Sequence, residues 1–380
     1  DYVPEGRTKY TRNPRPVLTY DQLQRQKEYF DEHIMNEVTV QPTLKQRQAA
    51  AVKVELLNHR KNNSFTIVDD PGPHIKKIRT MFIFRDKYNG SEFVKTKGRM
   101  VLCGNQQTRK TNVFAPVVDP MIIKLLCIMA LDSDYQMSLA DVVAAFLYSL
   151  IDEKYIYFYP PPQMNLPRGK VCRVNKGIYG LIQAPKLWYK HLSSTLLKMN
   201  LKRSSQDSCL FYNEDKTIYI AFHVDDLLIL SKDDKTLEDI RKQLQEVYKI
   251  KFTEVDYFLS LKIQRNKTTL LISDIQRIID MKNKHCPEDT RIEIIPIKPS
   301  IKDEEKADLE QVTRPMVSEK SYRSLLGELN YVSTKTRPDI SQAVSYLQRF
   351  QHIPTKSRYK EALRIVRYLY HTKQMVLRYT

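Results

Sequence analysis

Residues 217–231 read Thr-Ile-Tyr-Ile-Ala-Phe-His-Val-Asp-Asp-Leu-Leu-Ile-Leu-Ser, so that two adjacent aspartates, Asp225 and Asp226, interrupt an apolar run. The β-branched and aromatic residues on either side predict two strands of a hairpin with the acids at its tip. Paired carboxylates are costly to desolvate, which indicates a concave site where divalent metal ions offset their charge. Val-Asp-Asp recurs at residues 68–70, but Pro71-Gly72 follows it, which is typical of an ordinary turn. The doublet is therefore informative only in its context.

A third acid, Asp141, ends a predicted strand over residues 135–141 and precedes the apolar run 142–147. Three carboxylates that converge from a strand end and a hairpin tip can hold two Mg²⁺ ions roughly 4 Å apart. Mg²⁺ prefers few carboxylates together with phosphate oxygens and water, so such a site suits in-line displacement at phosphorus. The alternative is that Asp141 only ends a strand or caps a helix.

The composition favours a folded protein with a polyanionic partner. The 380 residues include 62 Lys and Arg against 44 Asp and Glu, a net charge of +18, and nucleic acid is the commonest partner for such an excess. Solvated surface lysines are the alternative. The nine glycines form neither a P-loop nor a dinucleotide-binding motif, and the five cysteines have no CxxC spacing that would indicate zinc. No run of 18 apolar residues occurs, so we expect no membrane partner.

The order of predicted elements favours an α+β fold. We expect helices over residues 20–37, 41–60, 120–131, 188–199, 236–247, 321–335, 338–350 and 355–372, and a helix that starts within 144–150. We expect strands over residues 66–70, 80–84, 92–94, 99–103, 135–141, 171–174, 258–264 and 269–273, with 65–103 forming one small antiparallel sheet. The last helix has a basic stripe of Lys356, Lys360, Arg364 and Arg367. This stripe is either a solvated face or a track for a phosphate backbone.

Several ordered blocks resemble the reverse transcriptases of copia-type (Ty1/copia, Pseudoviridae) LTR retrotransposon Pol polyproteins. The three most specific are Asp-Val-Val-Ala-Ala-Phe at 141–146, Lys-Gly-Ile-Tyr-Gly-Leu-Ile-Gln-Ala-Pro-Lys-Leu-Trp at 176–188 and Phe-His-Val-Asp-Asp-Leu-Leu at 222–228. Further blocks lie at 96–101, 114–117, 257–263, 322–327, 336–340 and 364–369. The resemblance runs from about residue 45 to the last residue.

The resemblance implies a right-hand polymerase fold of fingers, palm and thumb, with an antiparallel palm sheet and a helical C-terminal segment. The implied divisions are an N-terminal extension at 1–40, fingers at 41–120, a palm at 121–264 with a return of the fingers near 150–185, and a thumb and helical connector at 265–380. An RNase H domain would begin where the sequence stops, so we expect that domain to be absent.

The resemblance also implies roles for individual residues. Asp141, Asp225 and Asp226 would be the catalytic, metal-binding acids, with the backbone carbonyl of Val142 as a further ligand. Phe146 would exclude the ribose 2′-OH, with plain core packing as the alternative. The remaining substrate contacts would be Ala144 and Ala145 to the triphosphate through backbone N–H groups, Tyr179 and Gly180 to the incoming nucleotide, Gln183 near the template, and Lys97 and Arg99 to the triphosphate. Exposed strand cations are the alternative for the last two.

The implied activity is RNA-directed DNA polymerase, which copies RNA and DNA templates into cDNA with two Mg²⁺ ions; the choice between Mg²⁺ and Mn²⁺ stays open. The implied partners are an RNA template, a DNA or RNA primer, dNTP, and other Pol products such as RNase H and integrase. The implied location is a cytoplasmic virus-like particle, with the nucleus as an alternative. A catalytically inactive, nucleic-acid-binding relic and an RNA-synthesising polymerase are the competing functions.

Three positions depart from the family pattern. His223 stands where the family usually has Tyr, Ser260 where it usually has Gly, and Phe65 where it usually has Trp. None of them replaces a metal-binding acid, so we expect catalytic activity to be retained.

Overall fold

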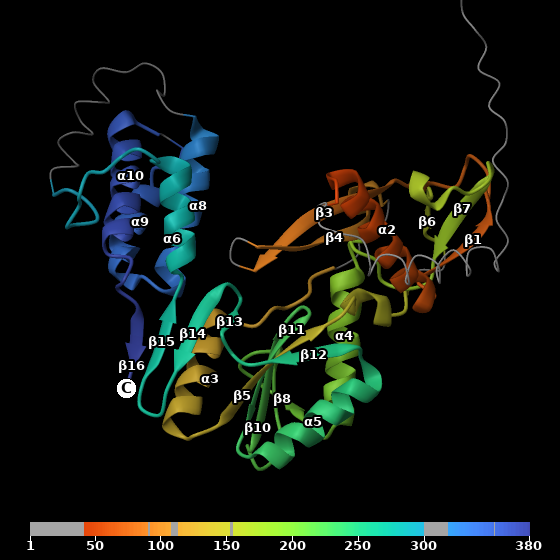
Figure 1. Ribbon diagram of the computed structural model, residues 1–380, viewed down its shortest axis with the longest axis horizontal. Coiled ribbons are helices and arrows are strands. Elements are labelled where there is room, and N and C mark those ends of the chain that lie inside the picture. The colour runs from red at the N-terminus through yellow and green to blue at the C-terminus, as the bar shows by residue number, and fades with distance from the viewer. Residues whose placement is uncertain (1–41, 90–91, 108–112, 153–154, 300–317, 353) are drawn as a thin grey trace, which may run out of the picture.

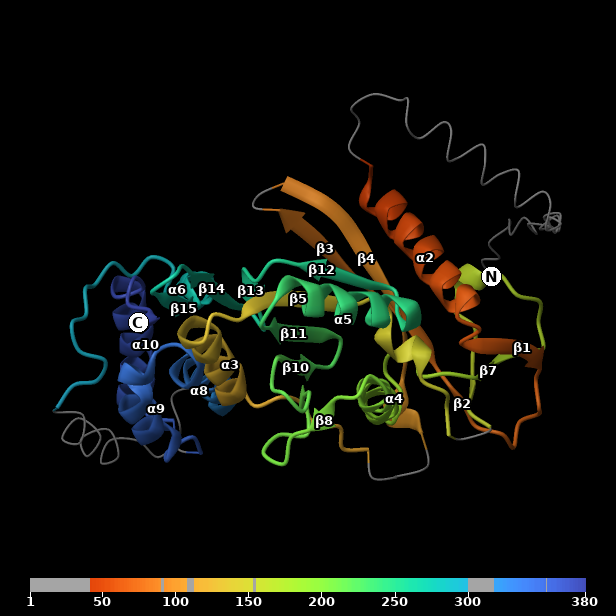
Figure 2. The same cartoon turned by 90° about the horizontal axis from the view of Figure 1, so that it is seen from below.

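The protein is described by a computed structural model that covers residues 42–89, 92–107, 113–152, 155–299, 318–352 and 354–380. A central sheet separates a helical bundle near the C-terminus from a region built on the first described helix and a long hairpin (Figure 1). The view from below shows the same order along the molecule (Figure 2). The α+β prediction is confirmed; the helix predicted at 20–37 lies outside the described residues.

The central sheet is antiparallel and has the strand order β12-β5-β11-β10-β9-β8. Its strands are β5 (Gln136–Val142), β8 (Lys202–Arg203), β9 (Leu210–Tyr212), β10 (Ile218–His223), β11 (Asp226–Ser231) and β12 (Ile250–Thr253). Around it lie the helices α3 (Pro120–Asp132), α4 (Ala184–Lys198) and α5 (Asp234–Val247). Leu227, Leu228, Ile229 and Leu230 are all fully buried, and helices α3 and α5 both contact β11. The predicted hairpin at 217–231 is therefore confirmed as β10 and β11 at the centre of the core.

The N-terminal region differs from the single sheet predicted over 65–103. Helix α2 (Leu44–Lys61) begins with a capping box between Thr43 and Gln46. A mixed sheet has the order β1-β7-β6-β2, and β3 and β4 form a separate hairpin. The strands are β1 (Phe65–Asp69), β2 (Lys77–Ile78), β3 (Thr80–Asn89), β4 (Glu92–Leu102), β6 (Tyr157–Phe158) and β7 (Lys170–Val174). The prediction was wrong because β1 pairs with β7, about a hundred residues away, and not with its sequence neighbours.

The Val-Asp-Asp tripeptide at residues 68–70 is confirmed as the start of an ordinary turn. Asp69 pairs with Lys170 at 2.7 Å, and Asp70 pairs with Lys77 at 2.5 Å while accepting the N–H of Gly72 at 2.9 Å. Each carboxylate therefore has its own cation and needs no metal ion.

Two predicted elements are interrupted by left-handed backbone. The helix expected within 144–150 is a single 3₁₀ turn, η2 (Ala145–Tyr148), because Ala144 has φ 57° and Ser149 is already extended. The strand expected over 258–264 is two strands, β13 (Tyr257–Phe258) and β14 (Leu261–Arg265). Leu259 and Ser260, with φ 50° and 68°, make the two-residue turn between them, which explains why a small residue is favoured there.

The C-terminal part combines a helical bundle with a second sheet of order β13-β14-β15-β16. Its remaining elements are β15 (Leu270–Ser273), α6 (Ile275–His285), α8 (Glu319–Lys335), η4 (Pro338–Ile340), α9 (Ser341–Gln348), α10 (Lys356–His371) and β16 (Leu377–Tyr379); two further 3₁₀ turns, η1 (Gly104–Gln106) and η3 (Pro162–Met164), lie elsewhere in the chain. The three predicted C-terminal helices are confirmed as α8, η4 with α9, and α10. Helix α6 and strand β16 were not predicted. None of the helices in the described residues is long and apolar enough to cross a membrane.

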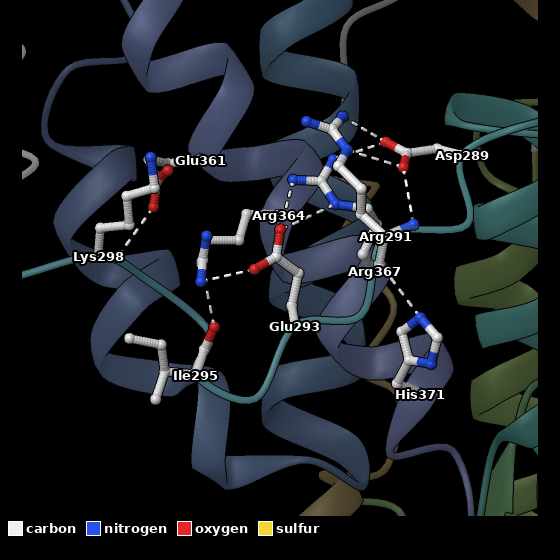
Figure 3. Close-up of polar contacts among 9 residues, drawn as sticks. All are labelled: Asp289, Arg291, Glu293, Ile295, Lys298, Glu361, Arg364, Arg367 and His371. Carbon is white, nitrogen blue, oxygen red and sulfur yellow. Dashed lines mark hydrogen bonds and ion pairs between the residues drawn. The ribbon is translucent and has the colours of Figure 1, made fainter.

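The predicted basic stripe on α10 is only partly a free surface. Arg364 and Arg367 lie against the segment before residue 299, where both pair with Glu293 at 2.5 and 3.0 Å (Figure 3). Arg367 also pairs with Asp289 at 3.1 Å. The prediction that these two arginines bind a phosphate backbone is therefore wrong, because acidic side chains within the fold already neutralise their charges. Lys356 and Lys360 are exposed.

Candidate active site

The three acids predicted to bind metal come together at one end of the central sheet. Asp141 is the register partner of Asp226 across β5 and β11, so both side chains leave the same face of the sheet. Asp225 lies in the two-residue turn between β10 and β11, and its carbonyl accepts the N–H of Val142 at 2.9 Å. The hairpin turn is thus joined to the end of β5, from which Asp141 projects.

The electrostatics of this site favour a cation. Burial, together with the neighbouring charges of Asp225 and Asp141, raises the pKa of Asp226 to about 6. Burial also raises the pKa of Asp225; its own backbone N–H opposes this shift, whereas Asp141 adds to it. Among the described residues, no three His, Cys, Asp or Glu side chains form a ready-made metal-ligand cluster. The acids therefore fit divalent metals by their oxygen chemistry and clustered negative charge, and not by preformed coordination.

Two predicted triphosphate contacts lie on β4 near these acids. Burial lowers the pKa of Lys97, and the nearby Arg99 and Lys87 lower it further, while Asp141 and Asp225 oppose the shift. Lys97 is therefore close enough to the acids for their charge to affect its pKa. Lys87 was not singled out from the sequence. The signal that could have found Lys87 is its place on β3, two residues after Arg85, which pairs with Lys97 on β4.

Phe146 and Tyr179 form an edge-to-face pair with ring centroids 4.8 Å apart and an interplanar angle of 69°. Phe146 lies in η2, five residues after Asp141, and is 9% exposed. The Arg99 guanidinium lies 5.2 Å from the Tyr179 ring centroid. Burial raises the pKa of Tyr179 to about 12, and the charge of Asp225 contributes in the same direction. Tyr179 thus links Phe146, the predicted ribose contact, to Asp225 and to Arg99 of β4.

Gly180 is required by packing. Its φ is 91°, and a Cβ at this position would lie 2.0 Å from the carbonyl oxygen of Leu102. The neighbouring Tyr179 carbonyl accepts the N–H of Leu102 at 2.8 Å. The loop before α4 therefore lies directly against the end of β4.

The other predicted contacts lie at the starts of η2 and α4. Ala144 is left-handed, and its carbonyl accepts the N–H of Leu147 at 2.9 Å; Ala145 is buried. Gln183 is buried, and its side-chain oxygen accepts a hydrogen bond from Gln107 at 2.9 Å. Their contacts to nucleotide and template stay predictions.

His223 is the register partner of Asp226 on β10. Its side chain therefore shares the sheet face of Asp226 and Asp141. The departure from the family pattern at this position thus faces the acids.

Comparison with known proteins identifies the family. Residues 62–297 match the family described as "Reverse transcriptase (RNA-dependent DNA polymerase)". The chain belongs to this reverse transcriptase family. The predicted assignment to copia-type retrotransposon Pol polyproteins is confirmed at this level, since the family match covers most of the chain and transposon proteins are among its relatives.

Three relatives of this chain illustrate the similarity. The Pol polyprotein from transposon RE1 of Arabidopsis thaliana is 30% identical over 316 residues, which is 81% of this chain and 21% of the relative. The polyprotein from transposon TNT 1-94 of Nicotiana tabacum is 28% identical over 340 residues, covering 84% and 25%. The putative transposon Ty5-1 protein of Saccharomyces cerevisiae is 34% identical over 249 residues, covering 63% and 78%. The chain thus spans about a fifth to a quarter of the Pol polyproteins.

Among solved structures, the chain is similar to a foamy viral protease-reverse transcriptase in complex with double-stranded DNA. The TM-score is 0.44 and the sequence identity 14%, over 97% of this chain and 62% of that one.

Proposed function

We propose that this chain is an active RNA-directed DNA polymerase that copies RNA and DNA templates into cDNA. The observation that supports it best is the arrangement of Asp141, Asp225 and Asp226. Two of them are cross-strand partners, and the third is joined by a hydrogen bond to the end of the same strand. Asp225 and Asp226 are half-buried, and burial is the main cause of their raised pKa values, so a bound cation would stabilise their ionised forms, and polymerase chemistry supplies one.

The three acids and the carbonyl of Val142 would hold two divalent cations. Bound there, the cations would activate the primer 3′-hydroxyl and neutralise the charge of the leaving pyrophosphate. Asp226 and Asp225 share partly buried surroundings, which strengthen electrostatic interactions with phosphate and metal relative to water. Mg²⁺ fits the all-oxygen donor set, as does Mn²⁺.

The surrounding residues of the chain would bind and orient the nucleotide. Lys97 and Arg99 face the acids from β4, where they would pair with the triphosphate. The Phe146 ring is braced by the edge-to-face contact with Tyr179, so it would form a rigid wall against a ribose 2′-hydroxyl. The remaining proposed contacts are Ala144 and Ala145 to the triphosphate, Gly180 to the nucleotide and Gln183 to the template.

The same proposal gives each part of the fold a role. Fingers would comprise residues 41–120 together with a return near 150–185, which the pairing of β1 with β7 supports. The palm would comprise 121–264, and 265–380 would form the thumb and connector. A chain with net charge +18 suits an RNA template and a DNA or RNA primer. RNase H and integrase as partners, and a virus-like particle as the location, follow from the Pol polyprotein context.

Primer extension tests the proposal. An RNA template with an annealed primer, Mg²⁺ and dNTPs should yield extended DNA, and Asp225→Asn should abolish extension. Asp69→Asn is the matched control, because Asp69 belongs to the other Val-Asp-Asp tripeptide and is 87% exposed. Extension with NTPs alone would favour an RNA-synthesising polymerase. Template binding without incorporation of either nucleotide would favour an inactive relic.

A further inference from the structure

The turn that contains Asp225 has a backbone conformation that its first residue disfavours. Val224 has a φ of 60°, in the left-handed region that glycine and asparagine adopt readily and that is unfavourable for a β-branched side chain. His223 pairs with Asp226, so Val224 and Asp225 alone form the turn. A two-residue hairpin turn with positive φ at its first position usually has glycine there. A contact from outside the hairpin is therefore needed to hold Val224.

Trp188 supplies such a contact from helix α4. Its indole Nε1–H donates a hydrogen bond to the carbonyl oxygen of Val224 at 2.6 Å. The indole is 1% exposed, and it is the single tryptophan of the 380-residue sequence. A buried indole N–H needs an acceptor, and here the acceptor is the peptide that precedes a catalytic acid.

This hydrogen bond orients Asp225 through the geometry of the peptide bond. The carbonyl of Val224 and the N–H of Asp225 belong to one planar group, so fixing the oxygen also fixes the N–Cα bond of Asp225. The carbonyl on the other side of Asp225 accepts the N–H of Val142 at 2.9 Å. The two peptide groups that flank Asp225 are thus held by two different elements, α4 and β5.

The indole itself has little freedom. Tyr248 lies edge-on to it with ring centroids 5.4 Å apart, and His191 stacks on it at 6.0 Å. Tyr148 completes the group at 6.3 Å from the indole. Tyr248 is anchored in turn, since its hydroxyl lies 2.7 Å from the Thr195 hydroxyl of α4. The donor therefore belongs to a packed aromatic cluster and not to a mobile side chain.

We propose that Trp188 is a positioning residue, which holds the Val224–Asp225 turn in the orientation that Asp225 needs for nucleotidyl transfer. The inference rests on the proposed function, because it assigns Trp188 a task in that reaction. Trp188 does not touch substrate; it acts through the backbone on which Asp225 is mounted. Its loss should therefore slow the chemical step more than it weakens nucleotide binding.

The decisive variant removes the N–H and keeps the ring. Replacing Trp188 by 3-benzothienylalanine puts sulfur in place of the N–H group at nearly unchanged shape. We expect the single-turnover rate of dNTP incorporation to fall roughly 10- to 100-fold, because small misplacements of reacting groups have effects of that size. The apparent dNTP dissociation constant should change less than threefold. Tyr248→Phe is the control, since it removes a hydrogen bond from the same cluster but none from the turn.

A second substitution separates positioning from packing. Val224→Gly relieves the left-handed strain, so the turn depends less on the indole. We expect removal of the N–H to slow incorporation by a smaller factor in the Val224→Gly background than in the wild-type background. Equal factors in both backgrounds would mean that the N–H does not act by holding the strained turn, and the inference would be overturned.

Hydrogen exchange of the turn gives a readout independent of activity. Amides in a peptide covering residues 222–228 should exchange faster in the benzothienylalanine variant, and at the wild-type rate in Tyr248→Phe. Unchanged exchange together with an unchanged incorporation rate would overturn the inference. A wild-type chain that incorporates no nucleotide would refute the proposed function, whereas the exchange comparison would still decide whether Trp188 holds the turn.

Discussion

The buried guanidinium of Arg367 pairs with the buried carboxylate of Glu293 at 3.0 Å, which joins the last long helix to the segment that follows α6. Arg364 reaches the other oxygen of Glu293 at 2.5 Å (Figure 3). Farther along the segment, the backbone N–H of Lys298 donates to Glu361 at 2.9 Å. The segment is thus held against α10 along its length by polar contacts.

Glu293→Gln should therefore destabilise the protein strongly. Removing one partner of a buried ion pair leaves uncompensated charge, here chiefly on Arg364 because Arg367 keeps its pair with Asp289, so we expect a loss of about 2–4 kcal/mol in the free energy of unfolding. Glu319→Gln is the control, because Glu319 pairs with Arg323 on the surface and its loss should cost at most about 1 kcal/mol. Urea unfolding of both variants measures the difference. Equal losses would contradict a special role for the buried pair.

The acid sensitivity of this network should depend on Asp289. Its hydrogen bonds to Arg291 hold the pKa of the Asp289 carboxyl well below its ordinary value of 3.8, and Arg367 adds to the shift. A lowered folded-state pKa stabilises the protein above pH 4, and this contribution is lost as the pH falls below 3.8. Asp289→Asn should therefore be less stable than wild type at pH 6, with the gap narrowing as the pH falls below 4. A gap that stays constant between pH 6 and pH 3 would contradict this assignment.

Gly180→Ala should disrupt the contact between β4 and the loop before α4. The added Cβ would meet the Leu102 carbonyl at 2.0 Å, and the φ of 91° is unfavourable for alanine. We expect a lower melting temperature and a smaller yield of folded protein. Gly327→Ala is the opposite case, since nothing lies within 4 Å of its Cβ and it is inside α8, so it should stabilise by roughly 0.5–1 kcal/mol. Similar behaviour of the two variants would exclude the steric explanation.

The sequence predicted those features that depend on neighbouring residues. The hairpin at 217–231 was predicted because its strands and its turn are contiguous, and helix α3 because residues 120–131 are one apolar run; the structure adds Asp119 as its N-cap. The Asp69-Asp70 pair was recognised as part of an ordinary turn from the Pro-Gly that follows it. Asp141 was singled out as an acid at a predicted strand end, but its distance along the chain from Asp225 gives no physical indication that the two lie together, and the family blocks supplied that link.

Features that depend on distant partners were not predictable from the sequence alone. A free and a neutralised arginine have the same sequence signature, so the pairing of Arg364 with Glu293 could not be anticipated. The sequence contains a single tryptophan, but nothing in it indicates that the indole donates to Val224. The left-handed backbone at Ala144 is imposed by tertiary structure on a residue that otherwise favours helix.

The aromatic pair should control the choice of sugar. Phe146→Ala removes the wall proposed to exclude the 2′-hydroxyl, so the ratio of NTP to dNTP incorporation should rise by roughly 10-fold or more, an effect of about 1.4 kcal/mol on discrimination. Tyr179→Phe keeps the edge-to-face contact and should leave that ratio unchanged. Single-nucleotide extension with matched NTP and dNTP measures both. An unchanged ratio in Phe146→Ala would mean that Phe146 only packs in the core and does not select the sugar.

Asp226→Asn should raise stability while it removes activity. The pKa of Asp226 is raised to about 6, so the folded state disfavours the ionised form, and this penalty grows as the pH rises from about 4 through 6. In EDTA at pH 7.5 the variant should be more stable than wild type by roughly 1 kcal/mol. This difference is smaller than the pKa shift alone would give, because Asp226 is partly exposed and solvent screens its charge. At pH 4 the two should be equal. Added Mg²⁺ should raise the melting temperature of wild type but hardly that of Asp226→Asn, and equal responses would mean that Asp226 does not bind the metal.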